Sequence, residues 1–416
     1  MSAVLAEEQS ALPDGWYWTT MGEIAEVVGG GTPRTTDPTN FGGGDVPWIT
    51  PADLSGYTEK YISHGSRFIT RKGLESSSAR MLPARTVLFT SRAPIGYVAI
   101  ARNPVATNQG FKSFVLKDGV LPEYVYWWLK GSKQRAEALA SGTTFLELSG
   151  ANAKKLPIPI APIDEQHRIV AEIEKQFSRL DEAVVNLKRV KANLRRQRLA
   201  VLRAAVAGTL SDDGRRADWI DTTIGDVGRV ISGLTKNPKR EDLPRKLPYL
   251  RVANVYANEL RLDEIEYIGV ADKELDKLLV RQGDLLIVEG NGSPDQIGRV
   301  ALWDGSIEKC VHQNHLIKVR FGSRVTPQWA MTWLLSPGGR REIESVSSST
   351  SGLHTLSTGK VARLPIPVPP VPDQHRIVAE VDRRLSIVRE VEAEVDANLK
   401  RAQALRQAVL TRAFAG

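Results

Sequence analysis

The residue types that perform enzyme chemistry occur in this chain, but none of them stands in a catalytic spacing. The sequence has no Asn/Asp-Pro-Pro-Tyr/Phe tetrapeptide for adenine methylation and no GxxxxGK(S/T) loop for a nucleotide-driven motor. It also lacks an HExxH motif, and Cys310 is its only cysteine, so no cysteine pair can bind zinc. The sequence therefore predicts a protein that is not an enzyme by itself and that binds no metal or cofactor of its own.

Two carboxylates and two glycine-rich stretches were weighed as exceptions. Asp284 and Glu289 after a predicted strand could suggest a nuclease carboxylate pair, but the lysine that such sites usually need is missing. The run Phe41-Gly-Gly-Gly-Asp45 is not preceded by the strong strand of a cofactor-binding loop, and Pro47 follows it. We interpret this run and Glu289–Pro294 as plain loops.

Composition favours a folded protein with a polyanionic partner. The chain has 416 residues, 42% hydrophobic and 25% charged, which suits two to four ordered domains. Its net charge of +8 is compatible with nucleic acid, although charge alone does not decide. A single cysteine fits a reducing cytoplasm, and no apolar run approaches the ~18 residues that span a bilayer. We expect a soluble protein in the cytoplasm.

The chain contains one framework twice. Residues 156–208 read LPIPIAPIDEQHRIVAEIEK and end RLAVLRAAVAG, while residues 364–416 read LPIPVPPVPDQHRIVAEVDR and end RQAVLTRAFAG, without a gap between them. Shorter matches lie upstream, namely Trp16–Ile24 with Trp219–Val227 and Ile95–Ala99 with Ile297–Ala301. The segments between these matches diverge. One framework with different loops is expected of one fold that reads two different targets.

The composition changes along each half and predicts five parts. Gly, Pro, Trp and Tyr with short apolar runs indicate strands between turns, with one short helix near Pro122–Ala140 and its copy near Pro327–Leu335, whose aromatic residues we expect in the core. The expected division is a flexible N-terminus at 1–11, globular domains at 12–155 and 211–363, and a proline-rich lead-in with a long helix at 156–210 and 364–416.

Each lead-in is expected to be extended, because prolines at such spacing cannot continue a helix. Asp164 and Asp373 are expected as N-caps of helices of about 40 residues, each about 60 Å long. Apolar residues then recur at steps of three and four, at Ile173, Phe177, Leu180, Val184, Leu187, Leu194 and Val201, and in the copy at Val381, Leu385, Val388, Val395, Leu399, Ala402 and Val409. The two stripes are buried most simply against each other.

The predicted fold class is α+β: a tandem duplication in which two mixed α/β-rich globular domains are joined by two long antiparallel coiled-coil helices. One antiparallel register places Glu174 opposite Arg406 and Asp382 opposite Arg198. Two reading units about 60 Å apart or less would suit a DNA site of two half-sites, one to two helical turns apart. Because the units differ in sequence, the two half-sites should differ as well.

The doubled QHRIVAE after a proline-rich run, with the openings GWYWTTMGEIAEV and ADWIDTTIGDVGRV, resembles the repeated framework of type I restriction-modification specificity subunits. The resemblance covers nearly the whole chain. It implies that 12–155 and 211–363 are target-recognition domains for the two halves of an asymmetric double-stranded DNA site. It also implies two adenine-N6 methyltransferase (modification) subunits and two restriction/translocase subunits as partners, which would bind S-adenosylmethionine, ATP and magnesium.

Base reading requires Arg, Lys, Asn, Gln, Ser or Thr on exposed loops. In the first domain the candidates are Thr32, Arg34, Thr35, Thr36, Thr50, Arg92, Asn108, Gln109 and Lys112. In the second domain they are Lys236, Asn237, Lys239, Arg251, Asn254, Asn291, Ser293, Gln313 and Asn314. We align Gln109 with Gln313, which makes the loops equivalent.

The starts of the two long helices carry a second set of candidates. Gln166, Arg168, Gln374 and Arg376 are predicted to dock a partner, with burial against their own domain as the open alternative. For His167 and His375 we expect capping or packing. The cations Arg195, Arg196, Arg198, Arg203 and Arg401 form either a solvated face or a contact with phosphates or a subunit.

One alternative function belongs to another class. A structural adaptor could hold two protein partners by its ends and touch DNA only non-specifically. An adaptor would have no need for basic or amide-rich divergent loops, and the candidate loops of this chain are both.

Overall fold

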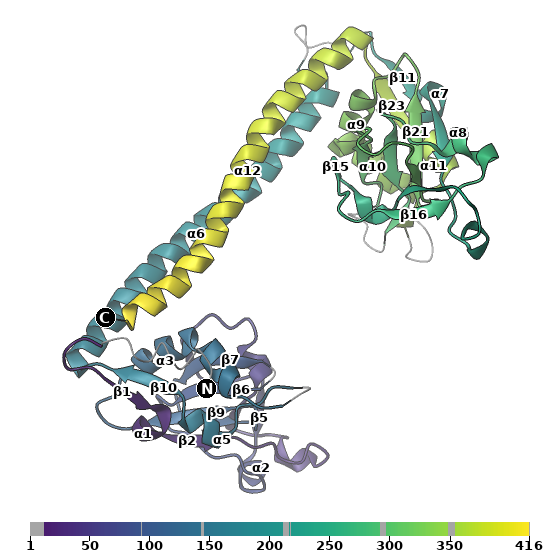
Figure 1. Ribbon diagram of the computed structural model, residues 1–416. Coiled ribbons are helices and arrows are strands. Elements are labelled where there is room, and N and C mark those ends of the chain that lie inside the picture. Colours follow the sequence, from purple (N-terminus) through teal and green to yellow (C-terminus); the bar gives the residue numbers. More distant parts are fainter. Residues whose placement is uncertain are drawn as a thin grey trace. The chain divides into compact units, whose positions relative to one another are not determined.

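The computed structural model describes residues 12–92, 94–142, 145–210, 216, 218–291, 297–347 and 354–415. The predicted N-terminal segment 1–11 lies outside the described residues. The chain divides into two compact units, one made of Met1–Leu187 with Ala397–Gly416 and the other of Lys188–Asp396. Each unit combines a globular α+β part with segments of the two long helices α6 (Ile163–Val206) and α12 (Val371–Ala413) (Figure 1).

Two sheets form the globular part of the first unit. Their strand orders are β2-β9-β6-β7-β4 and β5-β3-β8. The strands are β2 (Ala25–Gly29), β3 (Val46–Ile49), β4 (Tyr61–Ile62), β5 (Arg67–Ile69), β6 (Val87–Ser91), β7 (Ile95–Ala101), β8 (Ala106–Thr107) and β9 (Lys112–Leu116). The helices are α1 (Met21–Ile24), η3 (Pro38–Asn40), η4 (Pro51–Leu54), α2 (Arg71–Glu75), α3 (Pro122–Gly131), α4 (Lys133–Leu139) and α5 (Gly150–Lys154).

The second unit repeats this arrangement. Its sheets have the orders β12-β21-β17-β19 and β16-β13-β20, and β13 pairs with β20 in parallel as β3 does with β8. The strands are β12 (Gly228–Ser232), β13 (Lys246–Leu250), β14 (Val255–Tyr256), β15 (Glu259–Leu260), β16 (Glu266–Gly269), β17 (Leu285–Val288), β18 (Gly290–Asn291), β19 (Val300–Leu302), β20 (Val311–His312), β21 (Leu316–Phe321) and β22 (His354–Thr355). The helices are α7 (Ile224–Val227), η5 (Pro238–Arg240), η6 (Val252–Asn254), η7 (Asp272–Glu274), α8 (Leu275–Leu278), α9 (Pro327–Leu335), α10 (Pro337–Ser347) and α11 (Thr358–Ala362).

The proline-rich lead-ins are strands in two-stranded ribbons. β1 (Tyr17–Thr20) pairs with β10 (Pro157–Ile160), and β11 (Ile220–Thr223) pairs with β23 (Pro365–Val368), both antiparallel. A ribbon of two strands tolerates proline because each strand has a free edge. In each copy the opening segment and the proline-rich lead-in are hydrogen-bonded to each other in a ribbon. This pairing explains why both segments match between the two copies.

Aromatic residues of α3 and α9 fasten these ribbons, as core residues. Trp128 donates its indole N–H to Pro157 O at 2.8 Å, and the Tyr124 hydroxyl donates to Pro159 O at 2.8 Å. In the second unit Trp333 and Trp329 donate to Pro365 O and Pro367 O, both at 2.8 Å. The expectation that the aromatics of these helices belong to the core is confirmed.

A glutamine in the first turn of each long helix ties that helix to its own globular part. Gln166 Oε1 accepts from Leu121 N at 2.9 Å, and its Nε2 donates to Ala161 O at 2.9 Å and Gly119 O at 3.2 Å. Gln166 is fully buried. We call this glutamine, and its counterpart in the second unit, the glutamine latch.

Gln374 repeats these contacts in the second unit. Its Oε1 accepts from Thr326 N at 2.7 Å, and its Nε2 donates to Arg324 O and Pro369 O at 2.9 and 2.8 Å. The prediction that Gln166 and Gln374 dock a partner is wrong, because both are buried and their amides are hydrogen-bonded within the unit.

The helix starts differ from the prediction in two further ways. Asp164 and Asp373 lie inside the first turns of α6 and α12, so they are not N-caps, although their charge still suits the positive end of a helix dipole. For His167 and His375 we predicted capping or packing; both side chains are exposed, so they do not pack, and a capping role stays a prediction.

The two long helices are antiparallel, and the predicted fold class is confirmed. In the first unit Arg406 forms an ion pair with Asp181, and in the second Lys191 pairs with Asp396 at 2.5 Å. The predicted pairing of Arg406 with Glu174 is wrong by one heptad, because Glu174 pairs with Lys60 of the globular part instead. Among the described residues, no helix is long and apolar enough to cross a membrane.

The glutamine latch predicts a specific loss of stability. Gln374→Ala should destabilise the second unit by about 1–3 kcal/mol, because buried backbone groups lose their hydrogen-bond partner. Urea unfolding followed by tryptophan fluorescence reports the change, since Trp329 and Trp333 lie in this unit. His375→Ala, at the exposed neighbouring position, is the control that should leave the midpoint unchanged. Equal midpoints for both variants would contradict a latch.

Candidate nucleic-acid interface

In the first unit, segments from three other loops meet at the turn 108–110. Asn108 N donates to Ile49 O at 3.0 Å, so the turn lies beside Thr50 at the end of β3. Ser91 N donates to Gly110 O at 2.7 Å, which brings Arg92 to the same place. Gly31 N donates to Thr107 O at 3.0 Å, and the loop after β2 joins them. Backbone hydrogen bonds thus bring together most of the residues that we predicted to read bases in this domain. We call these residues the predicted readers.

The second unit builds an equivalent turn at 313–315. Gln313 N donates to Leu250 O at 2.9 Å, Glu289 N donates to His315 O at 2.9 Å, and Leu234 N donates to His312 O at 2.8 Å. These bonds match those of the first turn one for one. We call the two sites the reader turns.

The matching bonds correct our alignment of the readers by one residue. Asn108 corresponds to Gln313, and Gln109 corresponds to Asn314, because the equivalent backbone groups belong to those pairs. The sequence alignment of Gln109 with Gln313 is therefore wrong. The two amide side chains occur in reversed order in the two reader turns.

Polar side chains, one of them charged, lie at the first reader turn. Thr32, Arg34, Thr35, Thr36 and Gln109 are exposed, and the Thr32 hydroxyl donates to Gln109 Oε1. An exposed amide and hydroxyl side by side can offer donors and acceptors to a base edge.

Charged residues occupy one side of this turn. Arg92 pairs with Glu147 at 3.7 Å, and Lys112 opens β9 half-buried beside them. Burial lowers the pKa of Lys112, while the charge of Glu147 opposes that effect. An ion pair this exposed contributes little stability, so Arg92 can exchange it for another anion.

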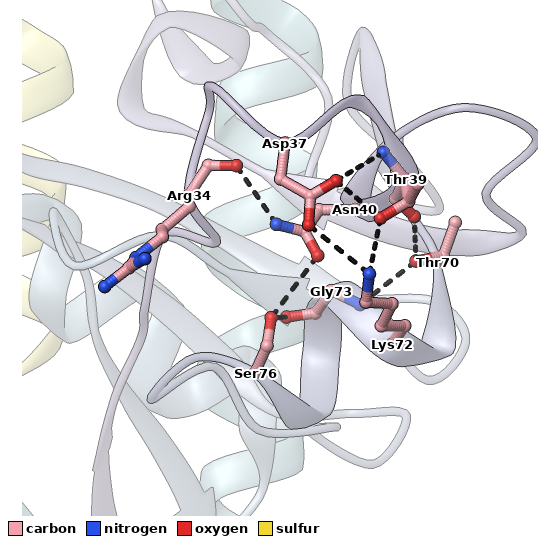
Figure 2. A network of polar contacts seen from close by, with 8 residues as sticks. All are labelled: Arg34, Asp37, Thr39, Asn40, Thr70, Lys72, Gly73 and Ser76. Atoms are coloured by element: carbon pink, nitrogen blue, oxygen red, sulfur yellow. Dashed lines mark hydrogen bonds and ion pairs between the residues drawn. The ribbon is translucent and has the colours of Figure 1, made fainter.

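The loop that carries Arg34, Thr35 and Thr36 is fixed by the network in Figure 2. Buried Asn40 donates its side-chain N–H to Arg34 O at 3.0 Å, and its backbone O accepts from Thr70 N at 2.8 Å. Figure 2 shows the Arg34 guanidinium pointing away from the network. The backbone of this loop is therefore held while its cation stays available.

The rest of the network holds the other end of the loop. Asp37 accepts from Thr39 N at 3.0 Å and pairs with Lys72 at 3.3 Å, and the hydrogen bonds from Thr39 lower the Asp37 pKa. Gly73 permits the close approach of α2, because a Cβ there would lie 2.5 Å from Asn40 O. A larger residue at 73 would displace the loop.

Around the second reader turn, one carboxylate organises two cations. Glu266 pairs with Lys236 at 3.0 Å and with Arg251 at 2.6 Å, and the hydrogen bond from Lys236 lowers the Glu266 pKa. Gln313 Oε1 accepts from Val252 N at 3.4 Å. Asn237 and Lys239 are exposed on the loop after β12.

Some predicted readers do not belong to these surfaces. Asn254 is buried, accepts from Arg251 N and donates to two backbone carbonyls, so the prediction that it reads bases is wrong. Thr50 lies beside the first reader turn, but its hydroxyl donates to Asp53 at 2.7 Å at the start of η4. The side chain of Asn291 and the whole of Ser293 lie outside the described residues.

A family model described as "Type I restriction modification DNA specificity domain" matches residues 13–189 and 216–397. The chain belongs to this family. The role of this family is DNA sequence specificity, and the family is non-catalytic. The two matched segments coincide with the two copies of the framework.

Relatives and solved structures agree with this assignment. The type I restriction enzyme MjaIX specificity subunit of Methanocaldococcus jannaschii is 37% identical over 261 residues, which cover 59% of each chain. The EcoKI specificity subunit of Escherichia coli is 24% identical over 97% of this chain and 89% of its own.

Two solved structures share the fold. One, titled "Structural basis underlying complex assembly and conformational transition of the type I R-M system", has a TM-score of 0.75 at 19% identity, covering 97% of this chain and 98% of the other. The HsdS subunit of Thermoanaerobacter tengcongensis has a TM-score of 0.58 at 19% identity, covering 98% of both chains.

Our sequence reasoning missed several residues of this specificity-domain surface. His315 is exposed, with its Nδ1 3.0 Å from Glu289 Oε2, beside the predicted Asn314. Glu147 lies at the first reader turn because it pairs with Arg92. The Arg67 guanidinium lies 4.7 Å from the centre of the Phe41 ring. His315 could have been found from the sequence, because it follows the predicted Asn314 directly. Glu147 and Arg67 are distant in sequence from every predicted reader, so the sequence offered no signal for them.

The two carboxylates that could suggest a nuclease pair have other partners. Asp284 is buried and receives two hydrogen bonds from Arg320, at 2.6 and 2.7 Å. Glu289 faces His315, as described above. Within the described ranges, no group of three or more His, Cys, Asp or Glu is placed to hold a metal ion.

The network around Asn40 predicts how the first reader loop is ordered. Asn40→Ala should increase amide hydrogen exchange in residues 31–41, because the carbonyl of Arg34 loses its donor. Exchange followed by mass spectrometry gives the measurement, with Asp45→Ala as an exposed control. Unchanged exchange in residues 31–41 would mean that the network does not fix the loop.

Proposed function

We propose that this chain is the specificity subunit of a type I restriction-modification complex and reads an asymmetric, bipartite DNA site. Each unit reads one half of the site through its reader turn. The observation that carries the proposal is the pair of reader turns, which share their backbone hydrogen bonds but differ in the side chains they present. Equivalent backbones give both units the same approach to DNA, and different side chains give them different targets.

The chemistry of the reader turns supports base reading. Amide side chains form paired hydrogen bonds with adenine, and arginine does so with guanine, each contributing about 1–3 kcal/mol of discrimination. The first turn presents Gln109 with threonines, whereas the second presents Asn314 with His315 and lysines. Because these sets differ, the two half-sites should differ in sequence.

The long helices support a fixed distance between the half-sites. α6 has 44 residues, which corresponds to about 66 Å of helix. A helix tied to its globular part by a buried latch acts as a spacer of constant length, so the number of base pairs between the half-sites should be constant.

A groove in the first unit supports docking of a modification subunit. It has a volume of about 600 Å³ and is lined by Trp16, Ile169, Ile173 and Val409, with Arg168 on its wall. Arg168 pairs with Glu165 at 2.5 Å on an exposed surface. An apolar floor with charged walls is typical of a protein interface.

The repeat preserves most residues of this groove, unlike those of the reader turns, although Gln176, Leu405 and Arg412 correspond to Arg384, Gln197 and Ala204. Trp219, Arg376, Ile377 and Val381 of the second copy match Trp16, Arg168, Ile169 and Ile173. Arg376 pairs with Asp373 at 2.8 Å, as Arg168 does with Glu165. A repeated surface fits two copies of one partner, which we identify with two adenine-N6 methyltransferase subunits.

The remaining partners follow from the family. Two restriction/translocase subunits complete the proposed complex, and S-adenosylmethionine, ATP and magnesium act in the partner subunits. The cytoplasmic location stays a prediction.

A chain with two identical reading units tests the proposal. When residues 12–155 are replaced by a second copy of residues 211–363, the recognised motif should consist of one half-site twice, because both reader turns are then the same. The chimaera is co-expressed with the modification subunits, and methylated adenines are mapped by sequencing. The unmodified chain is the control and should give a split asymmetric motif. A motif that does not depend on this chain would favour the adaptor.

The repeated groove predicts a stoichiometry. Arg168→Glu or Arg376→Glu alone should leave one modification subunit bound to the chain, and the double variant none, because each removes one of two equivalent docking sites. Native mass spectrometry counts the subunits. Lys175→Glu, also an exposed residue of α6 but not a groove residue, is the control. Two bound subunits in the double variant would rule out these grooves.

A further inference from the structure

A basic groove lies in the second unit, along the part of α6 that belongs to it. The groove has a volume of about 880 Å³. Its walls include Lys188, Lys191, Arg195 and Arg198 from α6, with Arg299 and Arg340 from the globular part. Among the described residues that line it, Glu392 is the one carboxylate. Two separate elements thus give one concave surface the same sign of charge.

The charge on this part of α6 is one-sided. Between Lys188 and Val206 the helix carries seven Lys or Arg residues and no Asp or Glu. Lys191 and Arg195 are four residues apart, and Arg195 and Arg198 are three apart, spacings at which like charges repel each other on a helix. The pair between Lys191 and Asp396 offsets part of this repulsion. A merely solvated face would gain from alternating charges instead.

The helix dipole does not explain the pattern. Cations are favoured in the last turn of a helix, which accounts for Arg203. Arg195 and Lys188 lie about three and five turns before the end of α6 at Val206, where the dipole has no such effect.

The internal repeat shows that most of the basic face belongs to one copy, since of the four α6 cations named above only Arg198 has a cation, Arg406, at the matching position of α12. The positions of α12 that correspond to Lys188, Lys191 and Arg195 are Asp396, Leu399 and Gln403. A surface for two identical subunits should occur in both copies, as most of the side chains of the docking groove do. A surface found mainly in one copy does not suit two identical subunits, and its positive charge suits the phosphates of DNA instead.

The groove also adjoins the second reader turn. Arg299 on its wall donates to Val252 O at 3.4 Å and lies 4.7 Å from the ring of Tyr256. Val252 in turn donates its N–H to Gln313 Oε1 of the reader turn at 3.4 Å. A duplex lying on this reader turn therefore has the groove beside it.

We propose that the basic groove binds the sugar–phosphate backbone of the duplex next to the half-site read by the second unit. The inference rests on the proposed function of the chain in DNA recognition. Lys and Arg that replace the counterions of phosphates add affinity and fix the position of the DNA, but they carry no sequence information. The groove therefore strengthens binding without changing the motif.

The test is the salt dependence of DNA binding by the complex of this chain with its modification subunits. Lys188→Gln combined with Arg195→Gln removes two exposed cations from the groove. The slope of log K against log salt should become shallower by about 1.8, at about 0.9 for each phosphate that the variant no longer neutralises. The methylated motif should stay the same.

Lys400→Gln combined with Arg401→Gln is the matched control, because it removes the same charge from exposed positions of α12 outside the groove. The control should keep the slope of the unmodified chain. An unchanged slope in the groove variant, or an equal change in both variants, overturns the inference. Loss of a modification subunit from the groove variant also overturns it, since the groove would then be a docking surface. Failure of the proposed function itself is distinguishable, because the unmodified complex would then show no motif.

Discussion

The structure depends on the buried joint between each long helix and its own globular part. Gln166 and Gln374 place one amide where it bonds the loop before α3 or α9 and also the end of the lead-in strand. A buried amide that lost these partners would cost more than its bonds contribute, so the joint has one favourable geometry. The direction of each helix is thereby fixed relative to the reader turn of its unit.

The side chains of the reader turns and those of the joint differ in how freely they can be substituted. The reader turns are held by backbone hydrogen bonds, such as those from Asn108 N to Ile49 O and from Gln313 N to Leu250 O. Any side chain that fits the surface leaves those bonds intact. The ribbons and latches, in contrast, use particular side chains, and they are the segments that match between the copies.

The sequence was sufficient to predict the duplication, the fold class and the two long helices, because apolar spacing and repetition are local signals. It was not sufficient for the register of the helices, since a seam with heptad spacing is satisfied equally after a shift of seven residues, and the ion pairs of Arg406 with Asp181 and of Lys191 with Asp396 decide the register. Nor does composition distinguish a reader from a buried polar residue. Gln109 and Asn254 are both amides that the sequence places on loops, yet one is exposed and the other lies in η6 and bonds the backbone.

The latch has a consequence for how such genes change. QHRIVAE occurs identically in both copies, at the junction where a globular part ends and its helix begins. A recombination event at this junction would transfer a whole reader together with an intact latch, so the product would fold without further adjustment. If the reader turns read the half-sites as proposed, new target sequences would then arise by exchange of complete modules, whereas point changes in one reader turn would alter one half-site by small steps.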